Sequence, residues 1–479
     1  MKRIHHIYIN GQFVTPHGTQ VQELINPTSG QPRASVVLGD ETDVDAAVAA
    51  ARAAYPAYSR TSKQERIAIL RRLHQAVAAR SEELVQVMVE EYGGTLAFCR
   101  ASVQRSANCF LQTSQLLETF DFVRTAGSAR VVLEPLGVVG IITPWNSSYG
   151  FICSKLATAL AAGSTAVIKP SELGATQTQL LTECLHAAQI PAGLFNIVNG
   201  SGDTVGAAIT AHRDIAKISF TGSTAVGKRI ARGAVDTLKR VTLELGGKSP
   251  NLLLDDADLE LAIPIAVAAF TFNSGQACLA GTRLIVPASR LEEIQRRIKT
   301  AVEALQVGDP ADAGTQIGPL VNAAQYARVQ RYIALGLEEG ATLLTGGAGH
   351  PPGLEHGYFV RPTVFVNVRN DMAIAQEEIF GPVLSIIACD SEEEAIAIAN
   401  DTRYGLQAYV SSGDPARANR VAAQLVAGRV FINGLYDEPL APFGGFKQSG
   451  IGREFGTYGL EAYLEPKAMM GYSAHDETP

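Results

Sequence analysis

The first third of the chain repeats apolar residues at the three- and four-residue spacing of amphipathic helices. This spacing runs through residues 43–124, and KQERIAILRRLHQAVAARSEELVQVMVEEYG is its longest clear example. Four short apolar runs follow, each before a turn, at residues 138–146, 163–172, 194–203 and 216–224. Helical stretches such as residues 177–189 separate them. Strands that alternate with helices predict a parallel sheet, which binds ligands at the carboxyl ends of its strands.

A second alternation of apolar runs and helical stretches begins near Ser249. NLLLDDAD, TRLIVPAS, PTVFVNV and GPVLSIIAC are typical of buried strands, and they predict a second α/β domain that extends to about Leu440. Residues 128–137 and 460–473 fit neither domain. We expect them to form a separate small sheet or a contact between subunits.

Composition narrows the function classes. The 479 residues suffice for two or three domains, and 46% hydrophobic with 18% charged residues is typical of a globular protein. The net charge of −7 offers no positive surface for nucleic acid or an anionic membrane. The six cysteines form no C-x-x-C pair and predict a reducing, cytoplasmic location. No signal peptide, membrane span or metal-binding motif is expected.

Two glycine-containing turns are candidates for binding phosphate groups. In AKISFTGSTAVGKRIARGA, Gly222 would permit close backbone approach, and Ser223 could begin a helix whose free N–H groups attract phosphate. The alternative is an ordinary strand-to-helix connection. NGSGDTVGAAI places Gly202 and Gly206 after a strand, but its spacing is not the dinucleotide fingerprint, so a plain turn remains open.

The expected strand that begins near residue 163 ends with Lys169, and Glu172 follows three residues later. Lys169 could donate to a ribose hydroxyl, and Glu172 could accept from one. The carboxylate would also repel a 2′-phosphate. A capped helix start is the alternative for this pair.

Four further residues could take part in chemistry. Asn146, in PWNSS, could donate to a developing oxyanion, and Glu244, in ELGGKSP, could act as a general base with a raised pKa. Glu378 precedes FGPV, and Cys278 lies between small neighbours in GQACLA. Taken singly, each has an ordinary alternative: a turn, a cap, a solvated loop and a buried thiol.

Together, these motifs resemble the aldehyde dehydrogenase superfamily over nearly the whole chain. PWN, KPSE, FTGST-x-x-G, ELGGK, GQ-x-C, E-x-FGPV and PFGGFKQSGIGREFG occur in the family's order. The resemblance implies an α/β protein with three parts. A Rossmann-like dinucleotide-binding domain would comprise residues 1–127, 138–248 and 441–459, an α/β catalytic domain residues 249–440, and a small oligomerisation sheet residues 128–137 and 460–479.

The resemblance also implies a role for each matching residue. Cys278 would be the nucleophile, Asn146 with the Cys278 backbone N–H the oxyanion hole, and Glu244 the base that activates water. NAD, favoured over NADP, would be the cofactor. Its adenosine ribose would contact Lys169 and Glu172, its pyrophosphate Ser223, and its nicotinamide ribose Glu378 beside Phe380. The other implied cofactor-lining positions are Ile142, Thr143, Pro144, Trp145, Ser171, Gly202, Gly206, Phe220, Thr221, Gly222, Leu245 and Gly246.

The substrate side departs from the common family pattern. Ser147 follows Asn146 where many relatives have an aromatic residue, and Ser154 aligns with a tunnel tryptophan, which suggests a wider, more polar entrance. We expect a hydrolytic aldehyde dehydrogenase that forms a homodimer or homotetramer. The alternatives are release of the acyl group to coenzyme A, a non-catalytic structural protein, and a cysteine hydrolase without a redox step.

Overall fold

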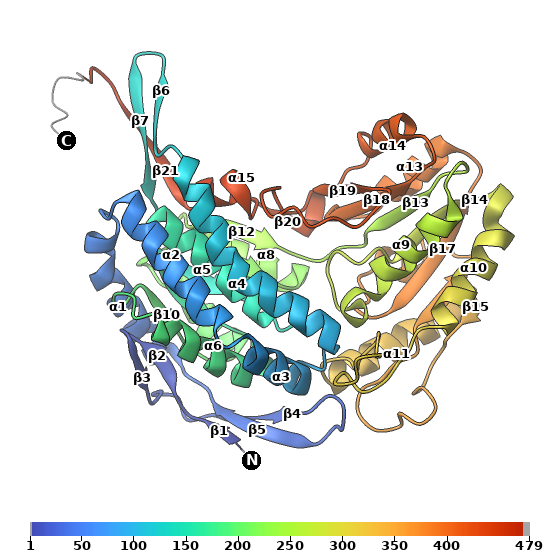
Figure 1. Cartoon of the computed structure of the whole chain (residues 1–479), viewed down its shortest axis with the longest axis horizontal. Helices are drawn as coiled ribbons and strands as arrows, with labels where there is room; N and C mark the ends of the chain where they lie inside the picture. Colours follow the sequence, from blue (N-terminus) through green and yellow to red (C-terminus); the bar gives the residue numbers. More distant parts are fainter. Residues whose placement is uncertain (1, 473–479) are drawn as a thin grey trace.

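Two mainly parallel β-sheets, each packed between helices, make up most of the protein (Figure 1). The structure is a computed structural model in which residues 2–472 are described. The first sheet and its helices lie on the left of Figure 1, and the second sheet lies on the right. The α/β class predicted from the sequence is therefore confirmed.

The first sheet has eight strands in the order β20-β12-β11-β8-β9-β10-β2-β3. Its central strands are parallel: β12 (Arg240–Glu244), β11 (Ile215–Thr221), β8 (Val138–Ile142), β9 (Thr165–Lys169) and β10 (Phe195–Ile197). Short antiparallel strands extend its edges: β20 (Gly450–Ile451), β2 (Ile7–Ile9) and β3 (Gln12–Val14). Because β9 and β10 lie on one side of β8 while β11 and β12 lie on the other, the strand order reverses there. A crevice at the carboxyl ends of β8 and β11 is thus the expected ligand site.

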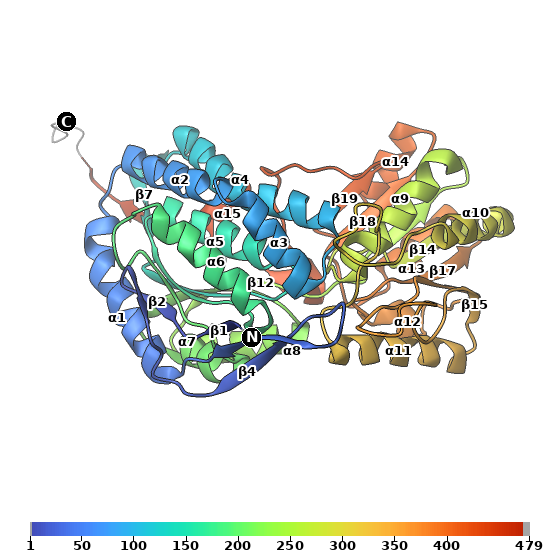
Figure 2. The same ribbon diagram turned by 60° about the horizontal axis from the view of Figure 1, so that its bottom comes forward.

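Helices cover both faces of this sheet (Figure 2). One layer contains α2 (Lys63–Ala78), α3 (Ser81–Tyr92), α4 (Leu96–Thr119), α5 (Ser148–Ala162) and α6 (Ala175–Ala187), and the other contains α1 (Glu41–Tyr58), α7 (Ala207–Ala211) and α8 (Thr224–Val235). Successive residues of a strand point to opposite faces. Val139 and Ile141 of β8 therefore join the core under the first layer, and Val138 and Ile142 join the core under the second.

The second sheet has the order β15-β16-β17-β14-β13-β18-β19. Its strands are β15 (Thr342–Thr345), β16 (Thr363–Val366), β17 (Val383–Cys389), β14 (Arg283–Pro287), β13 (Pro250–Leu253), β18 (Gln407–Ser411) and β19 (Arg429–Ile432), and only β15 is antiparallel. Its helices are α9 (Leu259–Thr271), α10 (Leu291–Glu303), α11 (Ala323–Glu338), α12 (Ala373–Gln376), α13 (Glu392–Asn400) and α14 (Pro415–Ala422). The four apolar runs found in the sequence correspond to β13, β14, β16 and β17.

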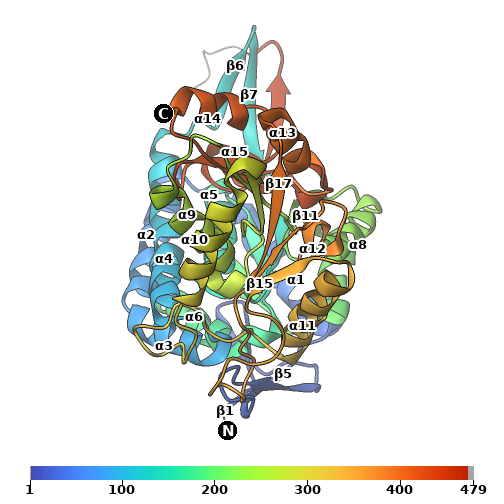
Figure 3. The ribbon, with the colours of Figure 1, turned by 90° about the vertical axis from the view of Figure 1, so that its right-hand side faces the viewer.

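A small antiparallel sheet projects from the body of the molecule (Figure 3). It has the order β21-β7-β6, with β21 (Leu464–Met469), β7 (Ala129–Pro135) and β6 (Val123–Ala126), and the short helix α15 (Gly456–Glu461) precedes β21. Residues 128–137 and 460–472 therefore meet in a sheet of their own. The sheet also includes β6, which lies before the expected boundary at residue 128 and begins in the last two residues of the stretch expected to be helical. Residues 473–479 of the expected oligomerisation segment lie outside the described residues.

The N-terminal strands were not predicted from the sequence. A separate three-stranded sheet is formed by β1 (Lys2–Ile4), β5 (Pro32–Val37) and β4 (Val21–Ile25). Their apolar runs are too short to show a clear period in the sequence.

Across residues 2–472, none of the helices combines the length and apolar character needed to cross a bilayer.

Candidate active site

Two cavities meet at Cys278. The larger has a volume of about 430 Å³ and reaches Cys278 and Asn146 between walls rich in aromatic side chains. The second has a volume of about 270 Å³ and contains the same two residues, with Thr221, Ser223 and other positions beyond the carboxyl ends of β8, β11 and β12. Since both spaces border one thiol, a molecule in each could react there.

The Cys278 loop and Asn146 are held together by a hydrogen bond. The Asn146 side-chain amide donates to the backbone carbonyl of Gln276 at 3.0 Å. Burial, together with the carboxylates of Glu378 and Glu244, raises the pKa of the Cys278 thiol above its ordinary value. The thiol is therefore protonated at neutral pH in this state, and its activation requires loss of that proton.

Glu244 is the last residue of β12 and is buried. Neither of its carboxylate oxygens accepts a hydrogen bond from the described residues. Burial first, and the negative charge of Glu454 second, raise the pKa of Glu244 well above its ordinary value. The carboxyl lies against Gly444, where an added Cβ would be 2.8 Å from Oε1, and Glu244 lines neither cavity. Its side chain must therefore turn to act next to Cys278.

A buried ion pair lies near Glu244. Lys155 of α5 contacts the carboxylate of Glu454, and its ammonium also donates to Ser219 Oγ at 3.1 Å. Glu454 also lines the larger cavity. Glu454 lies within the motif PFGGFKQSGIGREFG, but Lys155 lies within a helix without a recognisable motif, so the sequence does not reveal the pair.

Lys169 and Glu172 form an ion pair of 2.7 Å at the carboxyl end of β9. Lys169 is buried, whereas Glu172 is partly exposed and begins a short 3₁₀ turn. Ser171 caps that turn by accepting from the backbone N–H of Leu173. KPSE is thus a capped helix start, and the ribose contact of Lys169 and Glu172 stays a prediction.

The two glycine-containing turns differ from each other. Ser223 is the N-cap of α8 and accepts from the backbone N–H of Val226, so this turn begins a twelve-residue helix. Gly202–Gly206 is itself a helical turn of the π type that leads into α7. A Cβ at Gly202 would meet open space, and the nearest atom at Gly206 would be 4.0 Å away. The turn at Gly202–Gly206 therefore leaves room on the surface, whereas a Cβ at Gly222 would lie 2.5 Å from the ring of Phe220.

Some of the cofactor positions implied by the resemblance face the protein interior. The side chains of Ile142, Phe220 and Leu245 are buried in the hydrophobic core. Thr143 and Thr221 are buried as well, and their hydroxyl oxygens have no hydrogen-bond partner among the described residues. The second cavity brings together eight of the implied positions: Pro144, Trp145, Thr221, Gly222, Ser223, Leu245, Glu378 and Phe380.

A sequence model of the aldehyde dehydrogenase family matches residues 13–469. The chain belongs to this family. A curated relative from a Pseudomonas species, 3-succinoylsemialdehyde-pyridine dehydrogenase, is 46% identical over 98% of this chain and 99% of its own length. A putative aldehyde dehydrogenase of Staphylococcus haemolyticus is 42% identical over 97% of this chain and 98% of its own.

Solved structures of aldehyde dehydrogenases superpose closely on the chain. A mutant of aldehyde dehydrogenase C from Pseudomonas syringae, complexed with NAD+ and octanal, gives a TM-score of 0.97 at 45% identity, over 99% of this chain and 98% of that one. An NAD+ complex from Bacillus cereus gives 0.94 at 38% identity, over 97% and 96% of the two chains. The predicted family and the predicted oxidoreductase activity on aldehyde groups are confirmed, and these complexes agree with the predicted NAD cofactor.

Two further residues of this aldehyde dehydrogenase, both at the second cavity, were not predicted from the sequence. Gln325 and Arg328 of α11 line the second cavity. The Gln325 amide donates to the carbonyl of Phe380 at 2.6 Å, and Arg328 donates to the carbonyls of Glu378 and Ile379. Their three-residue spacing places them on one helix face, but no motif marks that face as part of a site.

Gln325 and Arg328 hold a strained loop. Phe380 has a φ of +65°, which is uncommon for a bulky residue, and its ring meets Trp145 edge-on with centroids 5.4 Å apart. Glu378 accepts from the backbone N–H of Gly247 at 3.1 Å, and burial raises its pKa to about 7. The loop therefore fixes a carboxyl group and an aromatic ring at the second cavity.

Two small polar residues line the larger cavity. Ser147 and Ser154 line it, and Phe151 and Phe272 lie on its walls. Five residues of the segment 435–440 line it as well, namely Leu435, Tyr436, Asp437, Glu438 and Pro439. Arg105 lines the cavity as well as the acids Asp437 and Glu438, so its lining carries charges of both signs.

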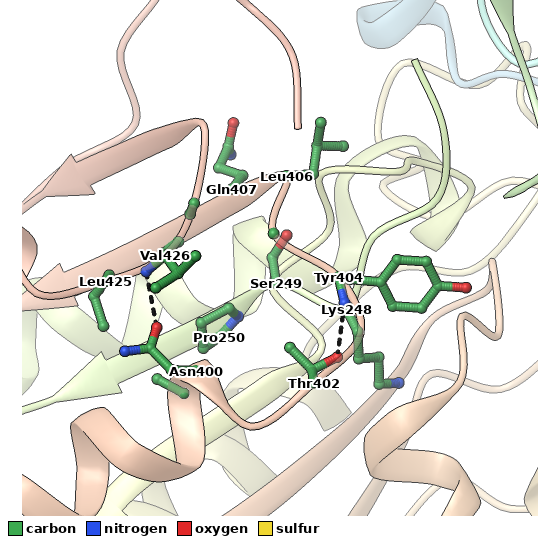
Figure 4. A pocket seen from close by; sticks show the side chains of 14 residues that line it. Lys248, Ser249, Pro250, Asn400, Thr402, Tyr404, Leu406, Gln407, Leu425 and Val426 are labelled. Atoms are coloured by element: carbon green, nitrogen blue, oxygen red, sulfur yellow. Dashed lines mark hydrogen bonds between the residues drawn. The ribbon is translucent and has the colours of Figure 1, made fainter. Parts of the chain in front are cut away.

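Other features are not suited to catalysis. No cluster of three or more metal-ligating side chains occurs within residues 2–472. A small cavity beside Lys248 and Ser249, shown in Figure 4, has a volume of only about 10 Å³. It is bounded by loops in which the backbone N–H of Val426 donates to Asn400 and that of Tyr404 donates to Thr402. That space suffices for about one water molecule, not for a substrate.

Proposed function

We propose that the chain oxidises an aldehyde to a carboxylic acid with NAD+ through covalent catalysis at Cys278, and that it hydrolyses the acyl-enzyme. The observation that carries this proposal is the position of Cys278, which borders two cavities and lies beside the oriented amide of Asn146. One cavity would admit the aldehyde and the other the nicotinamide.

The dinucleotide would lie in the second cavity and extend along the carboxyl ends of β8 and β9. The cavity offers the buried hydroxyl of Thr221 and the N-terminus of α8 at Ser223. The Thr143 hydroxyl and the Glu172 carboxyl follow β8 and β9 outside the lining of this cavity. Helix N-termini favour phosphate, and carboxylates accept from ribose hydroxyls. Glu378 would accept from the nicotinamide ribose. We assign the remaining cofactor positions as the resemblance implies.

Formation of the acyl-enzyme begins with loss of the Cys278 proton. The thiolate would attack the aldehyde carbon and form a thiohemiacetal. The oxygen of this adduct carries negative charge, which the Asn146 amide and the Cys278 backbone N–H would stabilise. The hydrogen bond to Gln276 fixes the Asn146 amide before the reaction, so no free energy is needed to orient it then.

Bound NAD+ would supply the hydride acceptor, and loss of hydride from the adduct would leave a thioester on Cys278. Glu244 would then take a proton from the water that attacks the thioester carbonyl. Its raised pKa suits this role, because a carboxylate with a raised pKa is a stronger base than an ordinary one. A turn of the carboxyl toward the loop would break no hydrogen bond with the described residues.

The coenzyme preference would follow from charge. Glu172 is held by Lys169 at 2.7 Å and is partly exposed, so it can accept from a 2′-hydroxyl and repel a 2′-phosphate. We assign a preference for NAD over NADP on this basis.

The substrate would be a bulky aldehyde. A cavity of about 430 Å³ far exceeds the needs of acetaldehyde, and its aromatic walls favour an apolar or aryl substituent. The octanal bound by the Pseudomonas syringae relative and the pyridine semialdehyde named for the Pseudomonas relative are both larger than acetaldehyde.

Assembly and location complete the proposal. The edge strands β6 and β21 of the projecting sheet have one partner each, and an unpaired edge can pair with another chain. We assign this sheet to a homodimer or homotetramer contact. The six free cysteines suit a reducing cytoplasm.

Incubation of the purified protein with octanal and NAD+, with and without coenzyme A, tests the proposed reaction. Reduced cofactor and octanoic acid should appear at the same rate in both reactions. Octanoyl-coenzyme A as product would instead indicate the acyl-transfer alternative, which does not need Glu244 as a base. Octanoic acid without reduced cofactor would indicate a reaction other than dehydrogenation, and no product would contradict the proposed function.

A further inference from the structure

The loop before Cys278 contains three consecutive residues in the left-handed region. Asn273, Ser274 and Gly275 have φ values of 56°, 55° and 76°. Glycine is required at the third position, because a Cβ there would lie 2.2 Å from the carbonyl carbon of Gly381. Non-glycine residues in this region cost free energy and persist only where their surroundings hold them.

Hydrogen bonds of the Asn273 side chain are the first contacts that keep this loop in place. Its amide nitrogen donates to the backbone carbonyl of Asn146 at 3.0 Å and to that of Gln276 at 3.1 Å. The Gln276 carbonyl is also the acceptor for the Asn146 amide. Asn273 therefore ties together the backbone that carries the oxyanion-hole amide and the backbone that leads to the nucleophile.

Hydrogen bonds of Tyr92, at the end of α3, are the second set of contacts that keep the loop in place. Its hydroxyl donates to Asn273 Oδ1 at 2.8 Å and accepts from Gln276 Nε2 at 3.2 Å. Gln276 Oε1 in turn accepts from the backbone N–H of Val321 at 3.0 Å. Tyr92 is buried, and burial raises its pKa well above the ordinary value, so the hydroxyl remains a donor at every working pH.

We propose that Tyr92 and Asn273 are positioning residues for the covalent step. The Tyr92 hydroxyl keeps the Asn146 amide and the Cys278 loop in the relative position that the reaction needs. Neither side chain is assigned a contact with the reacting atoms. The inference rests on the proposed function, because it concerns the same nucleophile. A misplacement of about 1 Å in such a site can slow the reaction up to about 100-fold.

Tyr92→Phe removes only the hydroxyl and keeps the ring beside Trp145, where the centroids are 6.0 Å apart. Asn273→Gly removes the amide and tolerates the left-handed backbone. Tyr58→Phe is the matched control, since its buried hydroxyl donates to the carbonyl of Leu160 at 2.9 Å, away from the site.

Rapid-mixing measurements with octanal and NAD+ give the rate of the first turnover. It should fall by between about 10-fold and 100-fold in Tyr92→Phe and Asn273→Gly and stay unchanged in Tyr58→Phe. The dissociation constant of NAD+ should stay unchanged in all three. Alkylation of Cys278 by iodoacetamide without cofactor should become faster in the two site variants, because a loosened loop exposes the thiol.

A purely structural role for the hydroxyl would lower the melting temperatures of Tyr92→Phe and Tyr58→Phe alike and leave the first turnover and the alkylation rate at wild-type values. An unchanged first turnover or an unchanged alkylation rate in both site variants would overturn the inference. Turnover of the wild-type enzyme alone tests the proposed function. The ratio of the first-turnover rates of variant and wild type tests the positioning role.

Discussion

The ammonium group of Lys169 lies 2.7 Å from the carboxylate of Glu172, and only the carboxylate is partly exposed. A cofactor that enters from the surface therefore meets the negative charge first. Loss of this charge while Lys169 is kept should make the site more receptive to a 2′-phosphate.

Glu172→Gln should lower the NAD-to-NADP ratio of kcat/KM by about tenfold, as expected for one like-charge repulsion at a partly exposed site. Steady-state kinetics with both coenzymes measure the ratio. Glu118→Gln, which removes the acid of an exposed ion pair with Arg71, should leave the ratio unchanged. Equal efficiency of the wild-type enzyme with both coenzymes would refute the assigned preference.

Cys278 should be the only essential cysteine among the six. Cys278→Ser should remove nearly all activity and keep NAD+ binding, because a hydroxyl is a far weaker nucleophile than a thiolate. Cys109→Ser is the matched control, since Cys109 lines the same cavity. Turnover of Cys278→Ser near the wild-type rate, measured by cofactor reduction, would show that the nucleophile has been misassigned.

Filling the cavity beside Ser154 should reverse the size preference. The wild-type enzyme should have a higher kcat/KM for octanal than for acetaldehyde, and Ser154→Trp should lower the octanal-to-acetaldehyde ratio below one. Ser154→Ala, which removes the hydroxyl that donates to the carbonyl of Phe151 without filling space, should keep the wild-type order. A wild-type preference for acetaldehyde would contradict the proposed substrate class.

The buried amine of Lys248 should make stability depend on pH. Burial lowers the pKa of Lys248 to about 7, and its amine has no hydrogen-bond partner among the described residues. The charged groups near it are Arg283, Glu378, Glu377 and Arg328. Since its folded pKa lies below the ordinary 10.5, the unfolded chain binds more protons between these values, and stability rises with pH through that window.

Lys248→Met removes this effect, so the melting temperature of the variant relative to wild type should be highest near pH 7 and should decrease toward pH about 9.5. Thermal unfolding of the apoenzyme at several pH values gives this difference. The exposed Lys299→Met should show no such trend. A pH-independent difference for Lys248→Met would show that the amine is charged in the folded state.

The sequence predicted those parts of the site that local motifs encode. Lys169, Thr221 and Glu244 end parallel strands of one sheet, so the alternation of strands and helices already placed them at one edge of that sheet. The two α/β halves followed from the same periodicity. The small sheet with β7 and β21 was one of two expectations for stretches that fitted neither half. The sequence left the turn at Gly202–Gly206 open between a phosphate turn and a plain turn. The structure shows a helical turn there, and its contact with the cofactor stays a prediction.

The missed residues act through tertiary structure. Tyr92, Lys155 and Gln325 lie on three different helices, and the sequence around each contains only the ordinary pattern of a helix. Their hydrogen bonds reach residues about 55 to 300 positions away, which no local spacing reveals. The strands β1, β4 and β5 were missed for another reason, because their apolar runs are too short to show a period.

Stalling the enzyme after one turnover tests the central claim most directly. Glu244→Gln keeps Cys278 and Asn146 but removes the base that would activate water. Mixed with octanal and excess NAD+, this variant should release a burst of reduced cofactor equal to the enzyme concentration and then turn over about 10²–10⁴-fold more slowly than wild type. Mass spectrometry of the Cys278 peptide should show the octanoyl adduct. Undiminished steady turnover, or the absence of both burst and adduct after long incubation, would contradict the account.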